Sequence, residues 1–395
     1  MRNIVGQAVS GNDFFERPQV VNKIRRAIRN GNQIYLSAPR RVGKTSIMYH
    51  LCDHPEDGQT FIYVITQSVD SVDGFYKELA KQVISSEAFG KLGRTGKTLK
   101  QSFTDLLQRL TLKVNVPGLG EVGLDKGTQT SLQTDFTELL EELDLDGGRL
   151  IIMVDEFTET IDNILVQHGK QEAKRFLQSF RELMHNRKLT GHVQFLLTGS
   201  IGLQPLVQKL GATDLINQLN ILDVPALSED EACVLFRRLV DQEGVTISDE
   251  TVRYILRKID WLMPFHVQLL VQEVIDVHES LVSPIDNAKA DKAFGQVFHQ
   301  RNKAYFEQYY GRLTKRLEAG SQHAFAHEVL NRAANADVLS KAVVHDLAVK
   351  HDFAEQYKAT LESLVYDGYL HETPDGAAYR FNSSILKTWW KKYVG

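Results

Sequence analysis

The chain has 395 residues, of which 43% are hydrophobic and 24% are charged, so it can form two or three ordinary hydrophobic cores. A formal net charge of −4 excludes a surface built throughout to coat nucleic acid, while a local basic face stays compatible with it. Cys52 and Cys233 are too few and too far apart for a disulfide framework or a zinc site. No apolar run of about 18 residues predicts a membrane span. We therefore expect a soluble, cytoplasmic protein.

The first element is an aromatic turn, Asp13–Pro18, followed by a helical pattern of apolar residues over Val20–Ile28. An aromatic turn can close over an adenine ring by stacking and backbone hydrogen bonds, which makes Phe15 and Arg17 candidate ligand contacts. Core packing of Phe14 or Phe15 is the alternative interpretation.

A strand predicted over Gln33–Ser37 leads directly into a loop that opens a helix. A loop of backbone N–H groups ending at a helix N-terminus attracts phosphate, and Gly-Lys-Thr is the core of that motif. Lys44 is expected to reach the β- and γ-phosphates and Thr45 to hold Mg²⁺. The standard spacing begins with glycine, where this chain has Ala38. The candidate phosphate-binding residues are Pro39, Arg40, Arg41, Val42, Gly43, Lys44, Thr45 and Ser46.

The two adjacent arginines are unusual for a surface turn. Arg40 and Arg41 repel one another unless an anion neutralises them, which favours a phosphate ligand for the loop.

Four more apolar runs rich in β-branched residues alternate with helical patterns. This alternation predicts a five-stranded parallel sheet with helices on both faces, in which ligands bind at the carboxyl ends of the strands. The four runs are Thr60–Thr66, Leu150–Asp155, Val193–Thr198 and Ile221–Val224.

Polar residues follow the third and fourth of the five strands. Two carboxylates at the end of a buried strand favour a metal role for Asp155 and a water-polarising role for Glu156. If the fourth strand lies between the first and the third, Thr198 or Ser200 can sense the γ-phosphate. For Ser200, an N-cap of the following helix is an equally good explanation.

An insertion is predicted at about 112–130, where an alternating pattern turns at Pro117-Gly118. It reads as a β-hairpin between helices. Its edges can serve a partner, and a plain insertion is the alternative.

The remainder of the chain reads as helices followed by a hairpin. Residues 227–282 are helical in pattern, with Pro264 at the first turn of a helix. Residues 301–395 contain helical patterns and then two aromatic-bearing runs joined by Pro374-Asp375-Gly376, which predict the wing of a winged helix. The helix before the wing, roughly Phe353–Tyr366, is the expected groove reader, yet this region has 13 basic and 11 acidic residues. Protein contact therefore weighs at least as much as DNA binding.

Together, the Pro-Arg-Arg-Val-Gly-Lys-Thr-Ser loop, the Phe-Phe-Glu-Arg entry, the Val-Asp-Glu-Phe strand end and the Leu-Leu-Thr-Gly-Ser strand resemble the archaeal-type ATPases of prokaryotes. Those ATPases belong with the STAND and origin-recognition-like branches of the AAA+ superfamily. The resemblance implies a P-loop core over residues 1–225, a helical lid over 226–300 and a winged helix over 301–395. It also implies that the helix beginning at Pro264 packs over the nucleotide.

For this chain the resemblance implies Lys44 and Thr45 on phosphate and Mg²⁺, Asp155 and Glu156 on metal and water, and Thr198 or Ser200 as sensor. No arginine lies between Ser200 and Asn220, where ring-forming relatives present an arginine finger. A ring with such fingers is then not expected, and Arg181 or Arg187 is a substitute candidate. Slow hydrolysis suits an ATP-dependent switch that controls a partner protein; the alternative is a DNA-binding loader.

Overall fold

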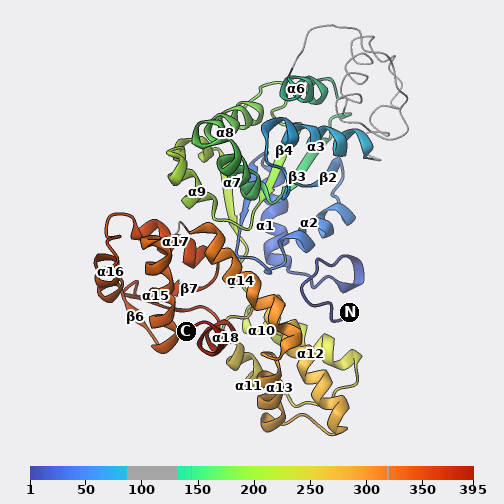
Figure 1. Cartoon of the computed structure of the whole chain (residues 1–395). Helices are drawn as coiled ribbons and strands as arrows, with labels where there is room; N and C mark the ends of the chain where they lie inside the picture. The colour runs from blue at the N-terminus through green and yellow to red at the C-terminus, as the bar shows by residue number, and fades with distance from the viewer. Residues whose placement is uncertain (87–130, 144, 318–319) are drawn as a thin grey trace. The chain divides into compact units, whose positions relative to one another are not determined.

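The computed structural model describes residues 1–86, 131–143, 145–317 and 320–395 (Figure 1). They form two compact units. The unit called here the core unit holds Glu16–Ser37 and Lys44–Val224, and the C-terminal unit holds Met1–Phe15, Ala38–Gly43 and Pro225–Gly395. The insertion predicted at about 112–130 lies outside the described residues.

The core unit contains the predicted five-stranded parallel sheet, in the order β2-β3-β4-β1-β5. Every residue of β4, and every residue of β3 after its first, is buried, because helices cover both faces of the sheet. The strands are β1 (Gln33–Ser37), β2 (Gln59–Ile65), β3 (Arg149–Asp155), β4 (Val193–Thr198) and β5 (Leu219–Asp223).

The helices of the core unit alternate with these strands, as the sequence predicts. They are α1 (Pro18–Arg29), α2 (Lys44–Asp53), α3 (Val72–Ser85), α6 (Leu132–Glu142), α7 (Phe157–His168), α8 (Lys170–Met184) and α9 (Leu203–Leu210).

Strand β4 lies between β3 and β1, which meets the condition set for Thr198 or Ser200 as a sensor. All three strands run in the same direction, so Ser37, Asp155 and Thr198, which end them, lie at one edge of the sheet. That edge is where parallel α/β sheets bind ligands.

The C-terminal unit is mostly helical, and one hydrophobic core runs through the regions predicted as lid and winged helix. Its helices are α10 (Glu229–Gln242), α11 (Asp249–Ile259), α12 (Pro264–Leu281), α13 (Asn287–Gln296), α14 (Lys303–Arg316), α15 (Ser321–Asn335), α16 (Lys341–Lys350), α17 (Tyr357–Tyr366) and α18 (Ser384–Tyr393). Ser228 is the N-cap of α10 and forms a capping box with Glu231.

The predicted hairpin near the C-terminus is present. Strands β7 (Leu370–Glu372) and β8 (Ala378–Phe381) pair antiparallel, and β6 (Leu339–Ser340) pairs with the other edge of β8. Asp375 holds the turn by accepting hydrogen bonds from the Thr373 hydroxyl and the Ala377 N–H. Among the described helices, none is both long and apolar enough to cross a membrane.

Candidate functional site

The carboxylate of Asp155 is the centre of the predicted site in the core unit. Asp155 is 3% exposed at the end of β3. Its Oδ2 accepts the hydroxyl of Thr45 at 2.7 Å, and its Oδ1 accepts the hydroxyl of Thr198 at 2.5 Å. Three residues predicted separately, on the loop-to-helix junction and on two strands, are thereby brought onto one carboxylate.

Tyr63 on β2 is a third side-chain donor to this carboxylate, and sequence reasoning missed it. Its hydroxyl donates to Asp155 Oδ2 at 3.0 Å. Burial and the negative charge of Asp155 raise the pKa of Tyr63, so the hydroxyl keeps its proton at neutral pH. A tyrosine in a strand rich in apolar residues reads as packing, which is why its sequence carried no functional signal.

Glu156 has a backbone conformation that side chains rarely adopt. Its φ is 62° and its ψ is 34°, in the left-handed region, at the N-cap of α7. Such strain is retained at sites where a side chain must point in a fixed direction. The Oε2 atom of Glu156 accepts the N–H of Ser200 at 2.8 Å. The two predicted residues, one after β3 and one after β4, are therefore in direct contact.

Ser200 is not the N-cap of the following helix, so that alternative interpretation is wrong. Helix α9 begins at Leu203 after Gly202, and the Ser200 hydroxyl donates instead to Glu159 Oε1 at 2.6 Å. Gly199 is required just before it, because a Cβ atom there would lie 1.9 Å from the hydroxyl oxygen of Thr158. Sequence reasoning singled out neither Glu159 nor Thr158, which lie in the first turn of α7.

The predicted phosphate-binding loop, called here the phosphate loop, comprises Ala38–Gly43 and joins β1 to α2. Lys44, at the first position of α2, is 7% exposed, and Ser46 is also buried. Arg41 and Gly43 have φ values of 65° and 98°, the positive sign that anion-binding backbone concavities use. The guanidinium of Arg41 lies over the ring of Phe265 at 4.0 Å, so aromatic faces as well as anions can hold a charge in this loop.

The remaining predicted ligand contacts are distributed over both units. Arg17 is buried in the core unit at the N-cap of α1. In the C-terminal unit, Phe15 packs against the core with the Arg238 guanidinium 5.6 Å from its ring centroid, and Pro264 occupies the first turn of α12 as predicted.

The two candidate arginines lie in and after α8. Arg181 is partly buried in the last turn of that helix, and Arg187 is exposed beyond its end.

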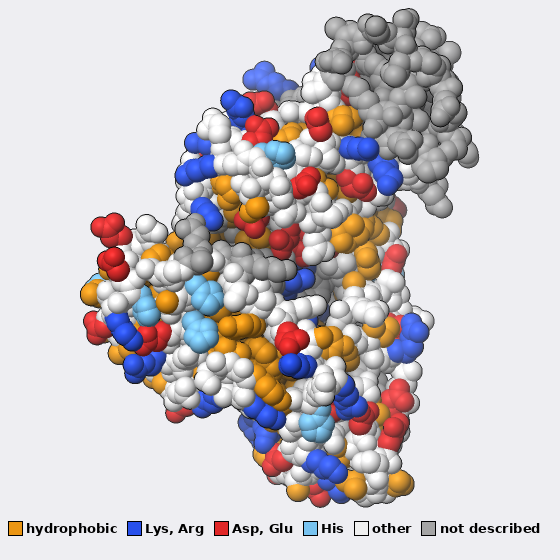
Figure 2. All heavy atoms as spheres, viewed as in Figure 1, with side chains coloured by type: hydrophobic (Ala, Val, Ile, Leu, Met, Phe, Trp, Pro, Cys, Tyr) orange, Lys and Arg blue, Asp and Glu red, His pale blue; other side chains and the backbone are white. Residues whose placement is uncertain are grey.

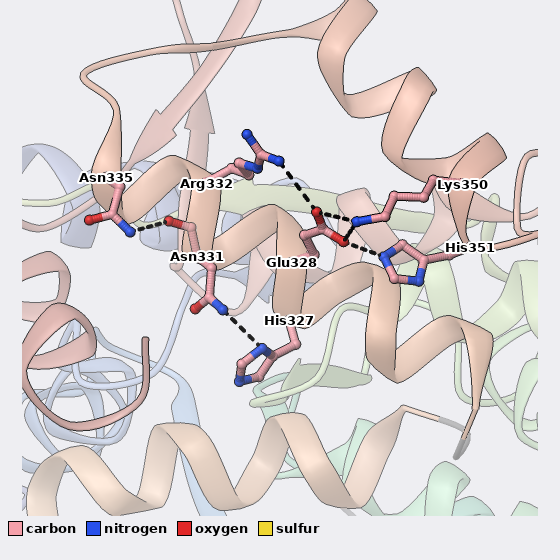
Figure 3. Close-up of polar contacts among 7 residues, drawn as sticks. All are labelled: His327, Glu328, Asn331, Arg332, Asn335, Lys350 and His351. Carbon is pink, nitrogen blue, oxygen red and sulfur yellow. Dashed lines mark hydrogen bonds and ion pairs between the residues drawn. The ribbon is translucent and has the colours of Figure 1, made fainter.

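A polar groove of the C-terminal unit is lined by one face of α15 (Figure 3). Glu328 is its central acid: it accepts hydrogen bonds from Lys350 and pairs with His351 and Arg332. Lys350 and His351 lower the pKa of the Glu328 carboxyl below its usual value. The opposite charges of this groove are therefore largely engaged with one another.

The strand order, the loop between β1 and α2 and the residues gathered at Asp155 define the P-loop ATPase fold. The structure is similar over 99% of this chain and 100% of the other to a Walker-type ATPase of Pyrococcus abyssi, with 16% identity and a TM-score of 0.65. It is also similar to the ORC2 protein of Aeropyrum pernix, solved as ADPNP and ADP complexes, with 12% identity and a TM-score of 0.53 over 95% and 92% of the two chains. No protein-family model and no curated protein matches the sequence.

Proposed function

We propose that this protein is an ATP-binding, slowly hydrolysing switch of the AAA+ superfamily, in its STAND or origin-recognition-like part. In this proposal the nucleotide state repositions a lid and a winged helix to control a partner protein. The observation that carries the proposal is the meeting of Thr45, Thr198 and Asp155 at the carboxyl edge of the sheet, beside the first turn of α2. Hydroxyls from that turn and from β4 on one strand-end carboxylate suit a triphosphate and its cation.

The residues present fit a magnesium ion. Mg²⁺ prefers oxygen ligands, and the Thr45 hydroxyl and the Asp155 carboxylate lie 2.7 Å apart. Thr45 would hold the ion directly and Asp155 through water, while Lys44 binds the β- and γ-phosphates. When bound, Mg²⁺ supplies positive charge that offsets the negative charge of the transferring phosphoryl group.

The residues after β3 and β4 would handle the attacking water. Glu156 is expected to orient and polarise it, since the Ser200 N–H fixes its carboxylate at the strand end. Thr198 would report the γ-phosphate to Asp155 through their hydrogen bond. Slow turnover follows from the lack of arginine between Ser200 and Asn220, because an arginine finger contributes on the order of 10³ or more to such rates.

The lid is proposed to comprise residues 226–300, and the winged helix residues 301–395. The element order α15-β6-α16-α17-β7-β8 supports the winged-helix proposal. As a groove reader, α17 exposes Lys358 beside Glu362, and on the face seen in Figure 2 basic and acidic side chains of the described residues are interspersed. A protein partner is thus favoured over duplex DNA, whose binding would require a basic surface.

Calorimetric titration with ATP and Mg²⁺ tests the proposal. Lys44→Ala is expected to abolish binding, and Glu156→Gln to keep binding while stopping turnover. The matched controls are Lys188→Ala and Glu172→Gln, exposed charges of the same unit, which should change neither property. ATP affinity that is unchanged in Lys44→Ala, or absent in the unaltered protein, would refute the site.

The partner class needs a separate measurement. Retention on immobilised duplex DNA is expected to be weak at all salt concentrations. Strong retention that falls steeply as salt rises would indicate phosphate contacts and favour the DNA-binding loader.

A further inference from the structure

The phosphate loop has two different kinds of attachment. Covalently it continues β1 and opens α2, both in the core unit, while residues Ala38–Gly43 pack as part of the C-terminal unit. The chain therefore passes between the units at both ends of a six-residue segment. A conformational change of the Ala38–Gly43 backbone would therefore alter the contacts that these residues make within the C-terminal unit.

The side-chain attachment of this loop is an aromatic cage around Arg41. The guanidinium carbon lies 4.0 Å from the centroid of the Phe265 ring, 5.3 Å from that of Tyr305 and 5.4 Å from that of Tyr309. Its Nη2 donates to Gln308 Oε1 at 2.8 Å. Its Nη1 is buried and has no hydrogen-bond partner within the described ranges, so the ring faces are what compensate this part of the charge.

The cage connects the loop to two helices. Phe265 belongs to the first turn of α12, and Tyr305 and Tyr309 lie one turn apart on α14. The Phe265 and Tyr305 rings are in edge-to-face contact with their centroids 5.3 Å apart. The Tyr309 carbonyl accepts the hydroxyl of Tyr369 at 2.5 Å, just before β7. Movement of Arg41 would therefore disturb a chain of contacts that runs from α12 through α14 to the small antiparallel sheet.

A second contact of the loop points the same way. Pro39 lies beside Gly368, whose φ is 81° and where an added Cβ atom would lie 2.6 Å from the Trp261 ring and 3.6 Å from Pro39. Trp261 in turn packs edge-to-face against the buried His266 of α12. Burial, with a smaller contribution from Arg41, lowers the pKa of His266 to about 4, so its ring is neutral near Arg41 at pH 7.

The backbone of Arg41 needs this support. Its φ of 65° is in the left-handed region, which residues other than glycine adopt at an energetic cost. A positive φ nevertheless helps to turn the N–H groups of the loop toward an anion. A guanidinium held between rings and Gln308 fixes the residue in this conformation.

We infer that Arg41 is a positioning residue, which holds the phosphate loop in its binding conformation through the cage and transmits the nucleotide state to α14. The inference rests on the proposed function, because it requires that the loop binds nucleotide. Coupling between two binding sites is reciprocal. If bound nucleotide changes the affinity of a partner for α14 by some factor, that partner changes the affinity for nucleotide by the same factor.

A double-mutant cycle on ATP affinity separates the cage from a direct phosphate contact. Arg41→Met, which keeps an apolar stem, is expected to weaken ATP binding about tenfold, and Phe265→Leu, which keeps apolar volume without a ring face, by a similar factor. The double variant should bind no more weakly than Arg41→Met alone. Tyr310→Leu is the control on α14, the helix that carries Tyr305 and Tyr309. It removes a ring that packs on Trp390, outside the cage, and should leave ATP affinity unchanged.

Hydrogen exchange of α14 provides the readout that a merely structural role would not change. Saturating Mg²⁺ and ATP should alter amide protection in α14 of the unaltered protein and leave it unaltered in saturated Arg41→Met. Additive losses of affinity, or the same α14 response in both proteins, would overturn the inference and leave the ATP site standing. Failure of the unaltered protein to bind ATP would overturn both.

Discussion

Replacing Thr198 by valine removes one hydrogen bond from Asp155 with little change of shape. Thr198 is fully buried, and its hydroxyl donates to Asp155 Oδ1. Valine leaves the carboxylate with Thr45 and Tyr63 as its side-chain hydroxyl donors. Because a hydrogen bond to a charged group contributes about 1.5–3 kcal/mol, we expect the core unit to lose stability of that order.

Thr198→Ser is the matched control, since it keeps the hydroxyl and removes one methyl group. A buried methylene-sized group is worth about 0.8 kcal/mol. The valine variant should therefore be less stable than the serine variant by about 1 kcal/mol, which corresponds to roughly fivefold in the opening equilibrium.

The assay must report on the core unit alone. The three tryptophans, Trp261, Trp389 and Trp390, belong to the C-terminal unit, so their fluorescence follows the wrong part of the chain. Hydrogen exchange of the slow amides in β3 and β4, measured without nucleotide at pH 7, reports the opening of the sheet itself.

Two results would refute this reasoning. One is equal exchange of the β4 amides in the valine and serine variants. The other is an unchanged difference between them when Asp155 is also replaced by asparagine, since a neutral acceptor should shrink the difference.

Two further predictions concern the C-terminal unit, where urea unfolding followed by tryptophan fluorescence is the suitable measurement. Val282, which is 86% exposed and ends α12 with a φ of 45°, adopts a conformation that costs about 1–2 kcal/mol, so Val282→Gly should raise the unfolding free energy by about 1 kcal/mol; a loss of stability would contradict this. Because Lys350 and His351 lower the pKa of Glu328 below 4.5, its ion pairs stabilise the fold fully above about pH 5 and lose this effect as the pH falls through the folded-state pKa. Glu328→Gln should cost about 0.5–1 kcal/mol at pH 7 and less below pH 4.5, and a cost independent of pH would point to packing instead.

The sheet could be predicted from the sequence because its strands are short apolar runs without alternation. Val193–Thr198 matches β4 residue for residue, and the edge strand β5 is shifted by no more than two residues. The order of the strands did not follow from the sequence: the position of β4 between β3 and β1 entered only as a condition for the sensor role of Thr198 or Ser200, and the structure meets that condition. The C-terminal hairpin was readable, since Pro374-Asp375-Gly376 breaks an otherwise strand-like pattern.

In the candidate site, the sequence could single out residues that carry charge or interrupt a pattern, such as Lys44 and Asp155. Tyr63 was missed because its hydroxyl bonds to Asp155 on the neighbouring strand β3, and the sequence does not show that β2 and β3 are neighbours. For Arg41 the sequence indicated an anion as the compensating group. Three aromatic rings from α12 and α14 lie there in the structure, and no local pattern brings those helices to the loop.

The chain leaves the core unit at Ala38 and re-enters it after Gly43, which limits how the protein can be divided into fragments. A fragment ending at Val224 retains Ala38–Gly43 but loses the rings that surround Arg41. A fragment beginning at Pro225 retains the rings but lacks Arg41. Neither half is therefore a self-sufficient module, and grafting a foreign C-terminal region onto this core would require a redesigned residue 41.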